Sequence, residues 1–218
     1  MTENLMEAMV SETKQKKPTD KKQRIVTVAA ELFAEKGYAN TSTSEIAKKA
    51  EVAEGTIFRH FQTKENLLLS ILVPFLKEAL PPMAEDVFSK VLNRYTDSPE
   101  SFFHALITNR YAFFIENKEY FQVFIKELVY NEQIRNEVIP IFQRTVLMQI
   151  ETAIQTFQEK GKITKTIPSE TLTRTAFSIM FGFFLTHLFF QNVDGESNIE
   201  EKINQLVHLI MNGMKTSV

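Results

Sequence analysis

A short stretch of the chain, residues 41–67, combines small, hydroxyl and basic side chains at a spacing suited to contacts with nucleic acid. Arg59 can donate to a guanine edge or to a phosphate, and Thr56 and His60 belong to the same outward set of a predicted helix. Gly55 occupies the first turn of that helix, where glycine lowers stability by up to about 1 kcal/mol relative to alanine. Close approach of a phosphate to the backbone would explain why glycine stands there.

Two short helices with a tight turn between them would position these side chains. The first is predicted over residues 44–50, with Thr43 as its N-cap and small apolar residues on one face. The second is predicted over residues 54–61 and turns Ile57 and Phe61 inward, four residues apart. Both are shorter than the roughly 12–15 residues that are stable alone in water, so each needs a packing partner.

A longer amphipathic helix, predicted over residues 21–36, supplies that partner. Its apolar residues recur at i, i+3, i+4, i+7 and i+8, and Gly37 suits a left-handed residue past its end. The next helix is predicted over residues 63–79, with Thr63 as its N-cap and Pro74 as an interruption. Three helices of this kind form the usual scaffold of a major-groove reader, although the pattern also fits a pair of ordinary surface helices with a charged face.

The order of residue types through this region separates the two interpretations. The informative positions are Gly37-Tyr38, Thr43, Ile46-Ala47, Ala50, Val52, Gly55-Thr56-Ile57-Phe58, His60-Phe61, Lys64-Glu65 and Leu67. This pattern resembles the DNA-binding domain of the TetR/AcrR family of transcriptional regulators over roughly Asp20 to Ala79. The resemblance implies that the DNA-binding residues are Thr43, Ala53, Glu54, Gly55, Thr56, Phe58, Arg59, His60 and Lys64.

Three residues depart from the family pattern. Glu51 stands in the turn where the family usually has glycine, which costs on the order of 1 kcal/mol if that position has φ above zero. Phe58 replaces the usual tyrosine and lacks a hydroxyl for phosphate. Glu54 is acidic where a basic or small polar residue is common; it can accept from a cytosine amino group but is repelled by phosphate. The expected fold survives these changes, whereas the DNA sequence that is read becomes unpredictable.

The remainder of the chain is predicted to be helical, and no segment alternates with the period of a strand. The expected fold is therefore all-α, with an N-terminal three-helix helix-turn-helix DNA-binding domain and a C-terminal helical ligand-binding and dimerisation domain. Further helices are expected over residues 98–116, 119–129, 131–160, 169–191 and 198–214. Ser98 and Ser169 are predicted N-caps, Pro140 is expected near a bend, and Asn198 with Glu201 forms a predicted capping box.

Three regions follow from this layout. Residues 1–18 are a flexible basic tail, in which Lys14, Lys16 and Lys17 are either disordered or an arm along the DNA backbone or minor groove. Residues 19–79 are the TetR-type domain, with the helix-turn-helix at 42–61. Residues 80–218 are the ligand-binding and dimerisation domain, and the boundary lies near Pro81-Pro82.

Residues 175–190 are apolar on nearly every face, which favours a helix buried on two sides. The run is shorter than the about 20 apolar residues of a membrane span, so no membrane association is expected. One face is expected to pack inside the subunit. Another face would meet its copy in a second subunit and, with residues 198–214, form a four-helix dimer interface, as the resemblance also implies. The predicted dimer residues are Phe177, Phe181, Phe184 and Leu188.

The chain has 19 phenylalanines, and most lie after residue 100. An aromatic core explains most of them, and a pocket for an apolar ligand is the functional alternative. The residues proposed to line such a pocket are His104, Tyr111, Phe114, Tyr120, Phe124, Phe183 and His187. The sequence does not decide whether side chains or a ligand fill the cavity.

Composition excludes several classes of chemistry. The chain has no cysteine, so disulfides, thiol nucleophiles and zinc-thiolate sites are absent. The four histidines are far apart without metal-ligand spacing, and no P-loop, G-x-G-x-x-G or G-x-S-x-G motif occurs. We therefore expect no enzyme activity, metal or cofactor. The N-terminus lacks an apolar signal segment, which favours a cytoplasmic protein.

Charge is distributed unevenly along the chain. Residues 14–64 contain eleven Lys and Arg against six Asp and Glu, while the chain from residue 65 onward contains 14 against 18. The excess of positive charge over residues 14–64 is modest, but it lies in the region expected to bind DNA.

The main hypothesis is a ligand-responsive transcriptional regulator, expected to be a repressor, that binds a palindromic operator in double-stranded DNA as a homodimer. A small hydrophobic effector would release it. The alternative is a helical carrier of lipid-like ligands whose N-terminal helices bind a protein partner.

Overall fold

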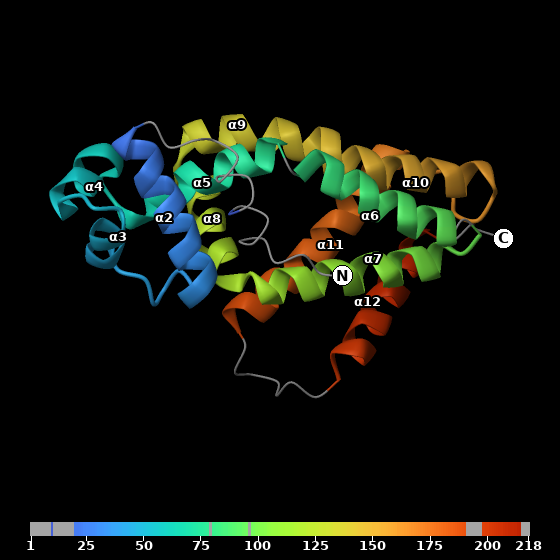
Figure 1. Ribbon diagram of the computed structural model, residues 1–218. Helices are drawn as coiled ribbons and strands as arrows, with labels where there is room; N and C mark the ends of the chain where they lie inside the picture. Colours follow the sequence, from blue (N-terminus) through green and yellow to red (C-terminus); the bar gives the residue numbers. More distant parts are fainter. Residues whose placement is uncertain (1–9, 11–19, 79, 96, 191–197, 215–218) are drawn as a thin grey trace. The chain divides into compact units, whose positions relative to one another are not determined.

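The structure is a computed structural model that describes residues 10, 20–78, 80–95, 97–190 and 198–214. Within these ranges the chain is helical and contains no strand (Figure 1), which confirms the predicted all-α class. The elements are α2 (Lys21–Lys36), α3 (Thr43–Lys49), α4 (Glu54–Phe61), α5 (Lys64–Glu78), α6 (Leu80–Arg94), α7 (Pro99–Glu116), α8 (Lys118–Tyr130), α9 (Glu132–Phe142), the π-helical turn η1 (Gln143–Leu147), α10 (Met148–Glu159), α11 (Ser169–Phe189) and α12 (Ile199–Met214).

The helices form two compact units. The head unit contains α2 to α5, α8 and the start of α9, through Val138. The body unit contains α6, α7 through Ile115, the end of α9, and the elements from η1 to α12. The basic residues Lys14, Lys16 and Lys17 of the predicted arm lie outside the described residues.

The core of the head unit forms where α2 supports the two short helices. Ile25 and Phe33 of α2 are fully buried, as is Ile46 of α3. The loop after α2 is held by Thr41, whose hydroxyl donates to the carbonyl of Gly37 at 2.8 Å. Gly37 has φ +83° and ψ 159°, a region that glycine occupies without steric cost. A left-handed residue was expected here; φ is positive, but ψ lies outside the left-handed helical region.

The head unit also includes α8 and the start of α9, which the sequence-based division at residue 79 did not group with it. The reason is a small apolar cluster in which Leu69 of α5 packs with Ile134 and Val138 of α9. Phe124 and Leu128 of α8 pack against the same cluster. These side chains would be exposed if α8 and α9 did not cover α5, so burial of apolar surface holds this segment to the head.

The N-caps refine the predicted helix starts. Ser42, and not Thr43, caps α3, because its hydroxyl accepts from the Glu45 N–H at 3.1 Å. Thr63 caps α5 as predicted, at 3.0 Å from the Asn66 N–H. Ser98 likewise accepts from the Ser101 N–H at 3.2 Å.

Other predicted boundaries change for local reasons. Ser169 is the first residue of α11 rather than its cap, and its hydroxyl donates to Glu151 at 2.9 Å. The sequence did not predict α6, which contains Pro81 and Pro82 in its first turn, where a missing N–H costs no helical bond. Pro74 lies inside a continuous α5.

The bend expected near Pro140 takes the form of a widened turn. Pro140 lies inside α9, and the π-helical turn η1 begins three residues later. Proline has no N–H and its ring crowds the preceding turn, and π-helical turns usually occur as single-turn insertions in α-helices. In the following residues Thr145 donates to the Ile141 carbonyl at 2.6 Å.

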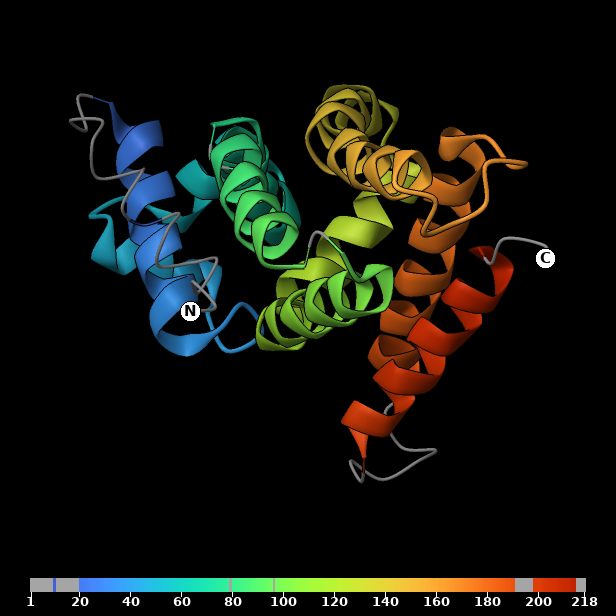
Figure 2. The same ribbon diagram turned by 90° about the vertical axis from the view of Figure 1, so that its right-hand side faces the viewer.

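The body unit is organised around α11, which lies beside both α10 and α12 (Figure 2). By length and composition α11 is the one described helix that could cross a membrane. Leu172, Ala176, Met180 and Phe184 are nevertheless buried within the unit at a four-residue spacing. This spacing is that of a helix packed in a protein core.

Candidate nucleic-acid interface

The candidate surface is built on α4 (Glu54–Phe61), which is anchored through one face. Ile57 and Phe61 are 1% and 5% exposed, as the four-residue spacing predicted. The turn before α4 contains Glu51 at φ +54°, so the position does require a positive φ and glutamate is strained there. The Val52 N–H donates to the Ala47 carbonyl at 3.0 Å, which closes the turn between the two helices.

The opposite face of α4 is open to solvent. Phe58 is 47% exposed, which is high for a phenylalanine, and Arg59 and His60 are exposed beside it. A Cβ added at Gly55 would meet no atom within 4 Å, and Gly55 does not have positive φ. Nothing inside the described chain therefore requires glycine at this position.

The predicted DNA-binding residues from α3 and α4 lie on neighbouring helices. The Thr43 hydroxyl at the start of α3 donates to Glu54 Oε1 at the start of α4, at 2.6 Å. Thr43 is free to do so because Ser42 makes the capping bond. Ala53 is the exposed residue before α4, and Thr56 is half-buried. The structure brings these residues together, while their contacts with DNA stay a prediction.

Lys64 lies at the start of α5, against the loop that follows α2. Its Nζ lies 4.2 Å from the centroid of the Tyr38 ring, a cation–π distance, and burial lowers its pKa. Burial also raises the pKa of Tyr38, and the nearby Glu65 carboxylate adds to that rise. Lys64 keeps partial exposure, so a phosphate contact remains possible from this position and stays a prediction.

Two residues of α8 fasten that helix to the head. The buried Tyr120 hydroxyl donates to the Phe33 carbonyl at 2.6 Å, and Glu119 Oε2 accepts from the Ala39 N–H at 3.3 Å. We expected Tyr120 and Phe124 to line a ligand pocket, and the structure places both in the head unit. Tyr120 ties α8 to α2, and Phe124 packs with α5 and α9. No local sequence signal indicates such long-range contacts.

Four other proposed pocket residues form an aromatic cluster in the body unit. Tyr111 packs edge-on against His187 at 5.4 Å between ring centroids, and Phe183 lies 4.4 Å from the same imidazole. Phe114 stacks on Phe184 at 5.4 Å. His104 lies elsewhere and pairs with Glu200 at 2.9 Å. The predicted set is thus divided between the aromatic cluster, the contact of His104 with Glu200, and the head unit.

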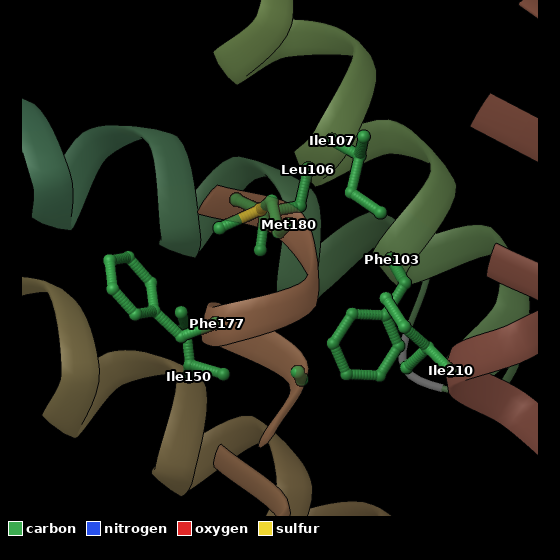
Figure 3. Close-up of a pocket in the computed structure, with 8 residues that line it drawn as sticks. Phe103, Leu106, Ile107, Ile150, Phe177, Met180 and Ile210 are labelled. Atoms are coloured by element: carbon green, nitrogen blue, oxygen red, sulfur yellow. The ribbon is translucent and has the colours of Figure 1, made fainter. Parts of the chain in front are cut away.

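The free space detected in the described body unit lies beside this cluster's helices but is lined by other residues (Figure 3). It is too narrow to hold a water molecule. Its walls are Phe103, Leu106, Ile107, Ile150, Ala176, Phe177, Met180 and Ile210. The proposed pocket residues do not line it. The i, i+3, i+4 spacing of Phe103, Leu106 and Ile107 is the sequence signal that could have indicated it.

The four residues predicted for the dimer face differ in their exposure. Phe184 and Leu188 are 6% and 5% exposed within the subunit, so the subunit's own side chains already cover them. Phe177 and Phe181 stack on each other at 5.5 Å and are half-buried. Large apolar exposure is found instead at Phe189, at 59% on α11, and at Leu209, at 63% on α12.

Comparison with known proteins agrees with this geometry. Residues 25–71, which run from α2 into α5, match the sequence model of the bacterial regulatory proteins of the tetR family. The chain belongs to the TetR family. The matched segment contains the whole helix-turn-helix of the head unit, so the family assignment and the exposed face of α4 concern the same residues.

Two curated relatives of this TetR-family chain come from Bacillus subtilis strain 168. The uncharacterized HTH-type transcriptional regulator YuxN is 30% identical over 147 residues, which cover 66% of this chain and 48% of the relative. The fatty acid metabolism regulator protein is 40% identical over 77 residues, or 35% of this chain and 39% of the relative. The chain therefore spans about half or less of these relatives.

A solved structure shares the fold over most of the TetR-family chain. Thermus thermophilus FadR, a TetR-family transcriptional repressor in complex with lauroyl-CoA, superposes with a TM-score of 0.58 at 22% identity. The alignment covers 90% of this chain and 96% of that one. At this identity the likeness establishes the fold, including the helical body.

Proposed function

We infer that the chain is a DNA-binding transcriptional regulator that acts in the cytoplasm as a repressor. The observation that carries this proposal is the outward face of α4, where Gly55, Phe58 and Arg59 are open to solvent while the other face is anchored in the core. An exposed phenylalanine and a glycine that the fold does not require both lower the stability of a protein that binds nothing at this face. Both are useful where a groove of DNA closes over the helix.

The chemistry of the surface matches a duplex. Arg59 and His60 end α4 with donors for phosphate or base edges. Lys64 starts the following helix, and its packing on Tyr38 restricts the motion of its ammonium group. A phosphate would meet backbone N–H groups at Gly55 without a side chain between them. Phe58 would make apolar contact, for example with a thymine methyl group.

A homodimer would bind a palindromic operator, because two copies of α4 reach two half-sites that are related by the same symmetry. The exposed Phe189 and Leu209 lie on the two neighbouring helices α11 and α12, which supports an interface there. Leu209→Glu and Phe189→Glu should convert dimers to monomers in sedimentation velocity. Tyr130→Glu, at an 82% exposed position of α8, is the control and should stay dimeric.

The effector is proposed to be a small hydrophobic molecule bound in the body unit. The free space among Phe103, Ile107 and Met180 is lined by apolar residues and is too narrow to hold a water molecule, so a ligand would have to part these side chains. Relatives in fold bind acyl-CoA, as the lauroyl-CoA complex of Thermus thermophilus FadR indicates. A ligand that favours the opened body would release the operator only if that form binds DNA less well.

The decisive experiment is a gel shift with the DNA upstream of the chain's own gene. For 6–10 phosphate contacts, the affinity should fall on the order of 10³–10⁵-fold between 50 and 200 mM salt. Arg59→Ala should abolish specific binding while the dimer persists in sedimentation. Lys90→Ala removes an exposed cation from α6 and should change neither property. Salt-insensitive binding, or normal binding by Arg59→Ala, would refute the proposal and favour a carrier of lipid-like ligands.

A further inference from the structure

One residue of the proposed DNA surface has the wrong charge for a phosphate contact. Glu54 is the first residue of α4 and is exposed, in a region where the other candidate contacts are basic, small or neutral. A carboxylate next to the DNA backbone is repelled by phosphate. Its presence at the leading end of the recognition helix therefore calls for a partner in the groove that donates hydrogen bonds.

The structure holds this carboxylate in one place. The Thr43 hydroxyl donates to Glu54 Oε1 at 2.6 Å, a short and charge-assisted bond. Thr43 is available because the capping bond of α3 comes from Ser42. Among the described residues no hydrogen bond is made to Oε2 of Glu54, so one oxygen is positioned by α3 and the other is open.

We propose that Glu54 reads a cytosine in each operator half-site and that Thr43 is the residue that positions it. This inference rests on the proposed function, because it assigns a base to a helix that is itself proposed to enter the groove. The N-terminal residues of a recognition helix are the ones that contact base edges. Glu54 occupies that end of α4, and its open oxygen accepts from the N4 amino group of the cytosine.

The donor and acceptor pattern of the major groove selects cytosine among the four bases. Guanine presents N7 and O6 and thymine presents O4, all of which are acceptors that repel a carboxylate. Adenine offers its N6 amino group, but the adjacent N7 acceptor opposes the second carboxylate oxygen. Cytosine presents its N4 amino donor with an acceptor, O6 of the paired guanine, on one side only and C5–H on the other, whereas adenine N6 lies between two acceptors, its own N7 and O4 of the paired thymine. A glutamine at the same position would instead match the paired acceptor and donor of adenine.

The test is selection of bound sequences from a randomised half-site library with the full-length dimer, followed by affinity measurements on the selected duplexes. The wild type should require cytosine at one position of each half-site, with a penalty on the order of ten-fold for other bases. Glu54→Gln should move the preference at that position to adenine. Glu54→Ala should bind all four bases there about equally, and the remaining positions should be unchanged in both variants.

The role of Thr43 is tested by the ratio of the affinities for duplexes with cytosine and with another base at that position, rather than by the affinity for one duplex. Thr43→Val keeps the side-chain shape and removes the donor, so the cytosine preference should fall several-fold, and Thr43→Ser should restore it. A residue that only stabilised the fold would weaken binding to all four bases equally. Glu35→Gln removes one exposed carboxylate from α2 of the same unit. It controls for the general rise in DNA affinity that follows when a carboxylate no longer repels phosphate. Thermal unfolding of each variant verifies that it is folded.

The outcomes separate this inference from the proposed function. If the wild type selects no specific duplex, the chain is not a sequence-specific regulator and the base assignment fails with it. If it selects a duplex and Glu54→Gln leaves every base preference unchanged, the regulator stands and the assignment to Glu54 is wrong. A cytosine preference that survives Thr43→Val refutes the positioning role of Thr43.

Discussion

Replacement of Gly55 by alanine should stabilise the protein and weaken its binding to DNA. Gly55 is the second residue of α4, does not have positive φ, and would accept a Cβ with no atom within 4 Å. Alanine is favoured over glycine in a helix by about 0.5–1 kcal/mol. Because this gain raises the midpoint of a 150–250-residue protein by about 2–4 °C per kcal/mol, a rise of about 1–4 °C is expected.

The expected effect on DNA has the opposite sign. If the Gly55 backbone lies against a phosphate, an added methyl group separates the two and removes a hydrogen bond to a charged group. Such bonds contribute about 1.5–3 kcal/mol, so the operator affinity should fall about 10–150-fold. The assays are thermal unfolding followed by circular dichroism, and fluorescence anisotropy with a labelled operator duplex at fixed salt.

A matched control separates helix propensity from contact with DNA. Ser89→Ala in α6, at an exposed position of the body unit, should raise stability by about 0.5 kcal/mol and leave DNA affinity unchanged. The reasoning is refuted if Gly55→Ala binds the operator as tightly as the wild type. It is also refuted if the variant is less stable, because the glycine would then be required by the fold itself.

Three further changes test the head unit by thermal or chemical denaturation. Glu51→Gly should raise the free energy of unfolding by about 1 kcal/mol, because φ is +54° at this position. Glu51→Ala keeps the Cβ and should not change it, so an equal rise in both variants would contradict the strain argument. Ser42→Ala should cost about 1 kcal/mol through loss of the α3 cap, whereas a larger loss in Thr43→Ala would contradict the assignment of the cap. Tyr120→Phe should cost about 1 kcal/mol by removing the 2.6 Å bond to the Phe33 carbonyl. Burial raises the pKa of Tyr120 to about 12 from 10, so the folded state favours the protonated hydroxyl. The contribution of Tyr120 to folding stability is complete below pH 10 and is lost as the pH rises toward 12. If the wild type loses no more folding stability in that window than Tyr120→Phe does, the assignment is refuted.

Local spacing was sufficient to predict which face of α4 is exposed. The four-residue spacing of Ile57 and Phe61 places both on the buried face of α4, which leaves Gly55, Phe58 and Arg59 outward by helix geometry alone. Positive φ at Glu51 was suggested only by the glycine that the family usually has at this position. These features depend on contacts between residues near in sequence, so the order of residue types is enough to determine them.

Capping shows where local information became ambiguous. Thr41, Ser42 and Thr43 all have a hydroxyl near the start of α3, and any of them could accept from the first turn. The structure assigns a different role to each: Thr41 donates to the preceding loop, Ser42 caps the helix and Thr43 donates to Glu54. The choice depends on a shift of one residue in the helix start, which periodicity does not resolve.

The sequence by itself determined which residues of each helix are apolar, and therefore the class of fold and the reading face of α4. Only the tertiary structure decided which apolar faces cover one another. Tyr120 and Phe33 are 87 positions apart, and their contact assigns α8 to the head. Phe184 is buried inside the subunit, although an apolar side chain at its position in the helix would suit a dimer face equally well. A helix of given periodicity can bury its apolar face against any helix of matching shape. Which helices pair is therefore decided by the close packing of the whole chain.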